Sequence, residues 1–215
     1  MWPLAGTAKG TVTPESGWKN LPSLVQELAG ASYTPLPALS YHVTVLSIFT
    51  ENKTKTPKWL QYIQNRAPRL KRAQEVLDDP MIGCTPKKMK FLGVRFDGRV
   101  IVCEFEIADD EEKKKCKEQE KKLVEILGVE PRSMYYHLTL AYRFPGAQVL
   151  TGTEDIEEKL TNKVAEYLEN NDMFLPLDKA DVNQFESMEA FPIWNSAGVS
   201  SENFESVPKF TPVDE

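Results

Sequence analysis

Two short segments of the chain carry the same residue types in the same order. Residues 41–45 read YHVTV and residues 136–140 read YHLTL, and the only two histidines of the sequence lie in them. Apolar residues flank each histidine and threonine, which favours a β-strand, and side chains two positions apart on a strand point to one face. We therefore expect His42 with Thr44, and His137 with Thr139, to present an imidazole beside a hydroxyl on a rigid support.

This set of side chains suits displacement at a phosphodiester. Two hydroxyls and an imidazolium can hold the non-bridging oxygens of the phosphate. Two histidines that titrate near neutral pH can supply a base for the entering oxygen and an acid for the leaving oxygen. The pattern predicts His42 and His137 as catalytic residues and Thr44 and Thr139 as phosphate ligands, but it does not say which histidine is the acid.

Two other interpretations of the histidines remain. Two histidines without a nearby Asp, Glu or Cys pattern offer too few ligands for zinc, and their spacing is not that of H-E-x-x-H on a helix. We expect no metal and no other cofactor. Alternatively, the repeat has no chemical role, and the two histidines then lie far apart in the folded chain.

Two residues after the second motif are candidates for substrate binding. Arg143 has the same strand parity as His137, so its side chain would add positive charge near the phosphate. Tyr142 has the opposite parity and is expected to pack, unless the twist at the strand end lets its ring stack on a base.

The surrounding pattern predicts an α+β fold with a mostly antiparallel sheet and flanking helices. Asp97-Gly98 between two apolar runs indicates a β-hairpin. Asp109 and Gly128 are the expected ends of a charged helix. We expect further helices at about 21–29, 70–77 and 153–168, and further strands at about 41–49 and 134–144 and within 174–191. The predicted organisation is an irregular arm at 1–19, one domain of two lobes at 20–193, and a polar tail at 194–215.

Charge and composition limit the partners. The net charge of −6 argues against a protein that coats long nucleic acid, because neutralising phosphates requires clustered Lys and Arg. The three cysteines show no C-x-x-C spacing, which favours a reducing compartment. No stretch approaches the roughly 20 apolar residues that span a bilayer. We expect a monomer in the cytoplasm, or alternatively the nucleus, that binds neither membrane nor long duplex.

The two motifs resemble those of the two-histidine phosphoesterase superfamily, whose hallmark is a pair of H-x-[TS]-x sequences. Here they stand at residues 42–45 and 137–140. The surrounding residues are similar to a poorly characterised branch of putative phosphodiesterases and RNA 2′,5′-ligase-like proteins. The resemblance implies two lobes related by a pseudo-two-fold axis, with the motifs meeting in a central cleft. It also implies metal-free action on 2′,3′-cyclic phosphates, short 2′,5′- or 3′,5′-linked nucleotides or RNA ends, and a role in RNA processing.

A rival from another class is a module that binds a nucleotide or an RNA end without turning it over. A matched acid–base pair argues against this, because binding alone does not require two histidines. The enzyme and binding-module hypotheses differ in their prediction for His42→Ala. If the chain is an enzyme, this change abolishes turnover but leaves measurable affinity for the substrate.

Overall fold

The chain folds as a mixed α+β structure. The computed structural model describes residues 4–8, 17–49, 62, 65–79, 81, 89–131, 136–169, 174–175 and 180–184. The described α-helices are α1 (Leu21–Ala29), α4 (Ala67–Asp78), α5 (Asp110–Leu127) and α6 (Glu154–Leu168). The strands are β1 (Leu4–Ala8), β2 (Tyr33–Pro35), β3 (Val43–Phe49), β4 (Met89–Phe96), β5 (Val100–Ile107), β6 (Tyr136–Arg143), β7 (Phe174–Leu175) and β8 (Ala180–Gln184).

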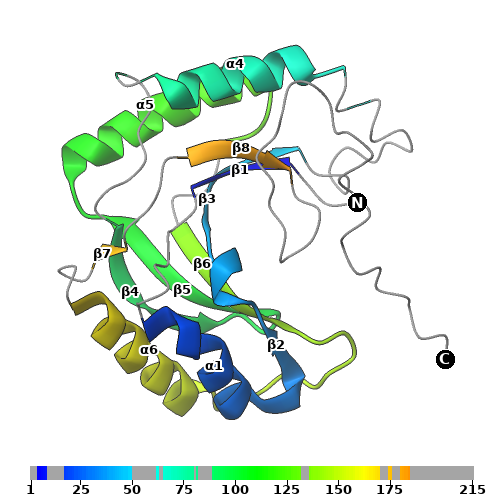
Figure 1. Ribbon diagram of the computed structural model, residues 1–215, viewed down its shortest axis with the longest axis vertical. Coiled ribbons are helices and arrows are strands. Elements are labelled where there is room, and N and C mark those ends of the chain that lie inside the picture. Colours follow the sequence, from blue (N-terminus) through cyan, green and yellow to red (C-terminus); the bar gives the residue numbers. More distant parts are fainter. Residues whose placement is uncertain are drawn as a thin grey trace.

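The described strands form one sheet. Its order is β7-β4-β5-β6-β3-β1-β8, with β2 paired to β6 outside this path. Each of these pairings is antiparallel. The sheet curves strongly, with α1 and α6 against one end and α4 and α5 against the other, all on its outer side (Figure 1). We call the face turned away from these helices the inner face.

One hydrophobic cluster lies between the sheet and helices α1 and α6. The cluster includes every second residue of β5, because alternate side chains of a strand point to one face. Ile101, Cys103 and Phe105 are each 0% exposed. Leu138 of β6 and Val43 of β3 belong to the same cluster and are also fully buried. This packing fixes the orientation of the strands that carry both motifs.

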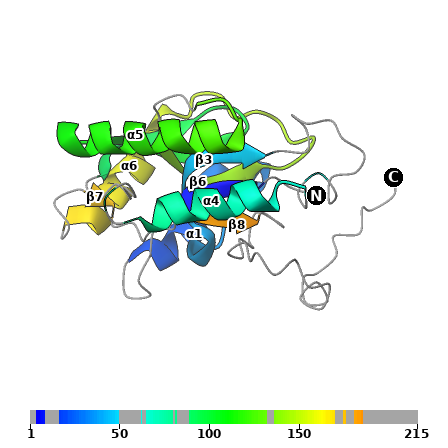
Figure 2. The same ribbon diagram turned by 90° about the horizontal axis from the view of Figure 1, so that it is seen from above.

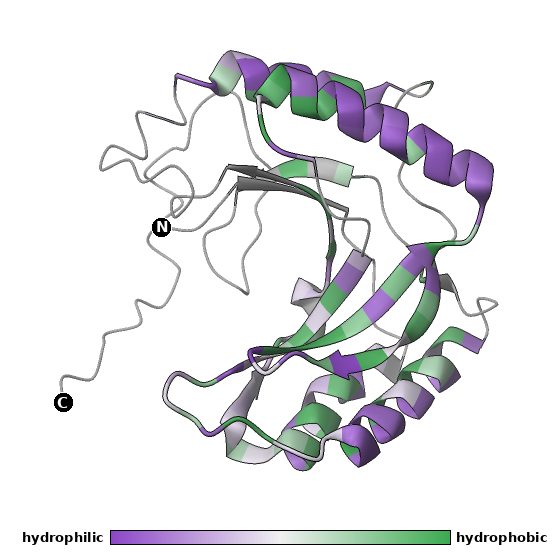
Figure 3. Ribbon diagram, turned by 180° about the vertical axis from the view of Figure 1, so that it is seen from behind, coloured by the Kyte–Doolittle hydropathy of each residue, from purple (hydrophilic) through white to green (hydrophobic). Residues whose placement is uncertain are grey.

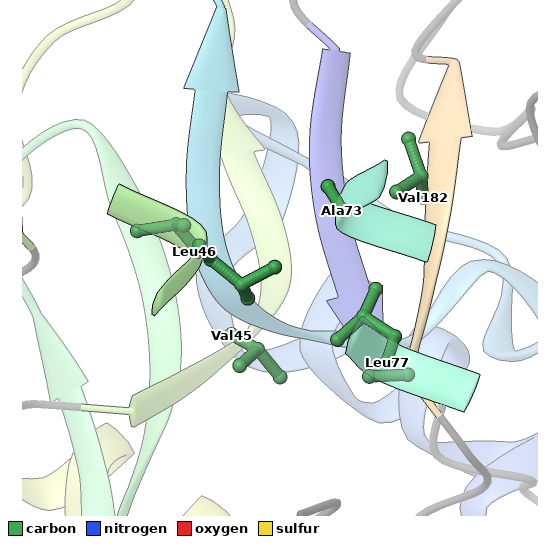
Figure 4. A pocket seen from close by; sticks show the side chains of 7 residues that line it. Val45, Leu46, Ala73, Leu77 and Val182 are labelled. Atoms are coloured by element: carbon green, nitrogen blue, oxygen red, sulfur yellow. The ribbon is translucent and has the colours of Figure 1, made fainter. Parts of the chain in front are cut away.

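A second cluster lies between helices α4 and α5 and strands β3 and β8. The two helices run side by side (Figure 2), and α5 is hydrophilic over most of its length (Figure 3). The small pocket in this cluster has a wholly apolar lining, so it offers no group for chemistry (Figure 4). Its lining residues are Val45, Leu46, Ala73, Leu77, Leu123, Ala180 and Val182.

The ends of α5 confirm the sequence prediction. The Asp109 carboxylate accepts the backbone N–H of Glu112 at 2.8 Å, and Gly128 ends the helix in the left-handed conformation with φ of 66°. An acceptor at the N-cap satisfies a backbone donor that the helix leaves unpaired, and glycine adopts positive φ without strain. None of the described helices is long and apolar enough to cross a membrane.

The predicted hairpin is also confirmed, although its turn comes one residue later than expected. Backbone N–H of Asp97 donates to the carbonyl of Val100, so Gly98 and Arg99 are the two central residues. The Asp97 carboxylate accepts the N–H groups of both Arg99 and Val100. Asp97 therefore holds the turn from its first flanking position.

The N-terminal segment differs from the prediction. Residues 4–8 form β1, which lies between β3 and β8, where the sequence suggests an irregular arm. The segment reads LAGTA and has neither the alternation nor the β-branched residues that mark a strand. The predicted tail at 194–215 lies outside the described residues. The pseudo-two-fold arrangement of two whole lobes stays a prediction.

Candidate active site

A tight turn places the first histidine. Residues Ala38–Ser40 form a short 3₁₀ helix (η3), closed by hydrogen bonds from the N–H of Ser40 to Pro37 and of Tyr41 to Ala38. The Ser40 hydroxyl donates to the same Pro37 carbonyl at 2.7 Å. The Ser40 carbonyl lies 2.8 Å from Nδ1 of His42. The imidazole is therefore oriented by the backbone of the turn that precedes β3.

Strands β3 and β6 bring the two motifs together. Val43 pairs with Leu138 in the antiparallel register, and both side chains are fully buried on the outer face. Residues on either side of an antiparallel pair face each other in reverse order. His42 therefore comes opposite Thr139, and Thr44 comes opposite His137. All four side chains belong to the inner face, because neighbours along a strand alternate.

The resulting arrangement is a rectangle with the histidines at opposite corners. Its sides measure about 5 Å across the strands and about 7 Å along them. The Cβ atoms of the two histidines are then about 8–9 Å apart, along the diagonal of this rectangle, with a threonine hydroxyl at each remaining corner. His42 and Thr44 are partly buried, Thr139 is 9% exposed, and His137 is exposed. The register of β3 and β6 thus brings the four residues together, whereas their catalytic and phosphate-binding roles stay predictions.

The two motifs are related by a local two-fold axis through the Val43–Leu138 pair. That axis carries His42 onto His137 and Thr44 onto Thr139, since each pair of residues is 95 positions apart, as Val43 and Leu138 are (43 to 138). Each strand also has a β-bulge at the fourth residue of its motif. On β3, Val45 is the extra residue that has no partner in the register with β1. On β6, Leu140 is the extra residue that has no partner in the register with β5.

The bulge at Leu140 reverses the faces predicted for the next residues. Ala141 pairs with Ile101 of the outer face, so Tyr142 joins Thr139 on the inner face opposite Val100. Arg143 pairs with Tyr33, which is buried in the cluster beneath α1 and α6. Strict alternation predicts Arg143 on the face of His137, and this is wrong because a bulge inserts one extra residue into the strand.

Tyr142 contacts the candidate phosphate ligand directly. Its side chain is hydrogen-bonded to that of Thr139. Burial raises the pKa of Tyr142 above its ordinary value of 10.0, and this outweighs the opposing effect of the Thr139 hydrogen bond. The phenol is therefore neutral across the range in which histidines titrate. Val102, opposite Thr139 on β5, is 3% exposed although it points away from the helix-covered cluster.

The inner face beside His137 carries two charged side chains that the sequence did not connect with the site. Glu104 of β5 pairs with His137, and Nε of Arg95 on β4 donates to Glu104 Oε1 at 2.7 Å. The alternation of β5 indicates that Glu104 faces away from the core. Its neighbour across the sheet, however, depends on a register that the sequence does not give. Among the described residues, no three His, Cys, Asp or Glu side chains gather as a metal site requires.

Residues 21–81 match a family model described as 2H-phosphodiest, a domain of unknown function (DUF1868). Over these residues the chain is similar to the two-histidine phosphoesterase group. The matched residues include the first motif, whereas the second lies beyond them and is joined to it by the β3–β6 pairing. The match supports a hydrolase that acts on phosphodiester bonds.

A solved structure shares the fold. It is the crystal structure of ATU0111, a conserved protein of unknown function from Agrobacterium tumefaciens str. C58, with a TM-score of 0.63 and 14% sequence identity. The similarity covers 90% of this chain and 84% of that one. At this identity the likeness concerns the fold alone. No curated protein matches the sequence.

Proposed function

We propose that this chain is a metal-independent phosphodiesterase that uses His42 and His137 as its acid and base. Its substrates are 2′,3′-cyclic phosphates, short 2′,5′- or 3′,5′-linked nucleotides, or RNA ends. The observation that carries the proposal is the pairing of Val43 with Leu138, because it sets two matched His–Thr pairs around one local two-fold axis. The family match at residues 21–81 supports the same class of reaction.

The rectangle of side chains suits the shape and charge of a phosphodiester. A phosphate centred over it meets the Thr44 and Thr139 hydroxyls at two opposite corners, where they can donate to the non-bridging oxygens. Hydrogen bonds to charged groups contribute about 1.5–3 kcal/mol each. The outer-face packing of Val43 and Leu138 keeps the donors in place before the substrate arrives, which lowers the cost of ordering them.

The positions of the histidines at opposite corners support an in-line displacement. One imidazole removes a proton from the attacking water as its oxygen bonds to phosphorus. The other gives a proton to the ribose oxygen as the opposite P–O bond breaks. The products are a phosphomonoester and a free hydroxyl, and the two histidines have exchanged protonation states. Each contributes about 100- to 10,000-fold by general acid–base catalysis.

The limited positive charge near the site favours a small substrate. On the inner face the described cations are Arg95 and Lys90, and Arg95 is already paired with Glu104. Long RNA would require many phosphate contacts, each of which releases counterions and makes binding depend steeply on salt. We therefore propose that recognition is confined to the nucleotide or RNA end at the reacting phosphate. We also propose that the chain acts as a monomer.

The test is turnover of the nucleoside 2′,3′-cyclic monophosphates with EDTA present. His42→Ala and His137→Ala should each lower kcat/KM by about 100- to 10,000-fold. Arg143→Gln is the matched control, because Arg143 lies near His137 in sequence but on the outer face, and its kcat/KM should stay within about twofold of wild type. Loss of wild-type activity in EDTA would contradict metal independence. Tight nucleotide binding without turnover would favour the binding module instead.

A further inference from the structure

The two histidines have different neighbours, although their motifs are matched. On the side of β6 away from β3, Glu104 of β5 lies directly opposite His137. Side chains in such a cross-strand pair have Cβ atoms about 4.5–5.5 Å apart. A carboxylate at that distance stabilises an imidazolium over a neutral imidazole. His137 is thus the histidine with a negative charge beside it on an adjacent strand.

The carboxylate is held in position by a second charge. Nε of Arg95 donates to Glu104 Oε1 at 2.7 Å, and the two side chains are 51% and 29% exposed. The ion pair fixes the Glu104 rotamer on the inner face. It also partly offsets the effect of Glu104 on His137, because Arg95 brings a positive charge to the same neighbourhood. Solvent screening at this exposure reduces both effects.

His42 is oriented differently. A carbonyl oxygen only accepts hydrogen bonds, so Nδ1 of His42 carries a hydrogen in its 2.8 Å contact with Ser40. In the neutral imidazole the lone pair is then on Nε2, which is the arrangement that a general base needs. The turn at residues 38–40 presents a neutral backbone group to this ring, whereas His137 faces a carboxylate.

We propose that Glu104 is a positioning residue that holds the proton on His137, so that His137 is the general acid and His42 the general base. This assignment rests on the proposed function. In the productive state the His137 imidazolium gives its proton to the leaving ribose oxygen. His42 takes the proton of the attacking water at Nε2.

Among the described residues, the other neighbours of His137 on the inner face do not supply the same effect. On β3 the neighbour is Thr44, which is uncharged. Farther along β6, the phenol of Tyr142 stays neutral because burial raises its pKa. Glu106 is an exposed carboxylate two residues beyond Glu104 on the same face of β5. Its partner in the register is Lys90 of β4. Glu106 therefore lies farther from His137 and serves as a matched control for Glu104.

The first experiment is an NMR titration of the two imidazoles, which the sequence allows because it contains two histidines. His42→Ala assigns the signals. Glu104→Gln should lower the titration midpoint of His137 by about 0.5–1 pH unit and leave that of His42 in place. Arg95→Gln should raise the His137 midpoint, since it removes the opposing charge. Glu106→Gln should move it by less than about 0.2 unit. An unchanged His137 midpoint in Glu104→Gln, or an equal shift in Glu106→Gln, would overturn the proposal.

The second experiment is the pH dependence of kcat/KM for the same variants. The high-pH limb reports the acid and should move down with the His137 titration in Glu104→Gln, while the low-pH limb stays fixed. Movement of the low-pH limb instead would reverse the assignment of acid and base. If the wild type turns over no phosphodiester, the proposed function fails, whereas the NMR titration still decides whether Glu104 acts on His137.

Discussion

The hydrogen bond between Thr139 and Tyr142 allows the β6 arrangement to be tested by a double-mutant cycle. Thr139→Val keeps the β-branched shape, so the packing of this 9%-exposed residue against β5 is preserved while its hydroxyl is lost. Tyr142→Phe removes the other partner. Each change leaves one hydroxyl without the partner that it has in the wild type.

The magnitudes follow from the burial of the pair. A hydroxyl that loses its partner in a partly buried site lowers the free energy of unfolding by about 1–2 kcal/mol. The double variant leaves no unpaired group from this pair. It should be more stable than the sum of the single changes predicts, by about 1 kcal/mol. A coupling of this sign requires Tyr142 and Thr139 to share a face, which only the bulge at Leu140 allows.

The same variants separate structure from catalysis. Thr139→Val should lower kcat/KM by roughly 10- to 150-fold, which corresponds to about 1.5–3 kcal/mol for a hydrogen bond to a charged oxygen. Thr139→Ser keeps the hydroxyl and should lose less than about tenfold. Tyr142→Phe should also lose less than about tenfold, because the Thr139 hydroxyl remains to bind phosphate.

Urea unfolding followed by the fluorescence of tryptophan, including the buried Trp18, gives the stabilities, and hydrolysis of a 2′,3′-cyclic monophosphate gives the rates. Additive stability changes would show that the two hydroxyls do not interact and would contradict the face assigned to Tyr142. Wild-type kcat/KM in Thr139→Val would remove Thr139 from the phosphate site.

Three further predictions concern the frame of the site. Tyr41→Phe should leave the free energy of unfolding unchanged or raise it by up to about 1 kcal/mol in urea titrations, because the buried Tyr41 hydroxyl has no hydrogen-bond partner among the described residues. A loss above about 1 kcal/mol would reveal a partner. Asp109→Ala should lower the free energy of unfolding by about 1 kcal/mol, since the N–H of Glu112 loses its acceptor, whereas Asp109→Asn should largely retain it. Burial raises the pKa of the Cys103 thiol, so the protonated form stabilises the fold. Stability should therefore fall as pH rises above 9.0, the ordinary pKa, by up to about 1.4 kcal/mol per pH unit from this group. In urea titrations at pH 8 and pH 10, Cys103→Val should show a shallower fall, and an equal fall would exclude the thiol as its source.

The elements with strong local signals could be predicted from the sequence. The charged helix between Asp109 and Gly128 has an acceptor at its start and a glycine at its end, and both act locally. The hairpin at Asp97-Gly98 and the two His–Thr segments are likewise marked by turn residues and alternation. These features depend on neighbouring residues, so one sequence is enough to read them.

The relations between strands could not be predicted in the same way. A bulge at Leu140 depends on how β6 pairs with β5, and no residue type at that position signals it. Because of the bulge, Tyr142 lies on the inner face and Arg143 on the outer face, which is the reverse of what strict alternation predicts. For the same reason the sequence predicts that Glu104 faces away from the core but not that it is the neighbour of His137. The sequence does not predict strand β1, because its small residues carry no strand signal and the strand is defined by its pairing with β3 and β8.

The Val43–Leu138 pair also bears on the order in which the molecule forms. It joins positions 95 apart in the chain (43 to 138), whereas β4 and β5 are separated by a two-residue turn. Contacts between distant positions require the closure of a long loop, which slows their formation. We expect the hairpin and the caps of α5 to form early and the β3–β6 pairing late during refolding. The return of turnover would then mark the completion of the fold, and it should lag behind the recovery of helical circular dichroism.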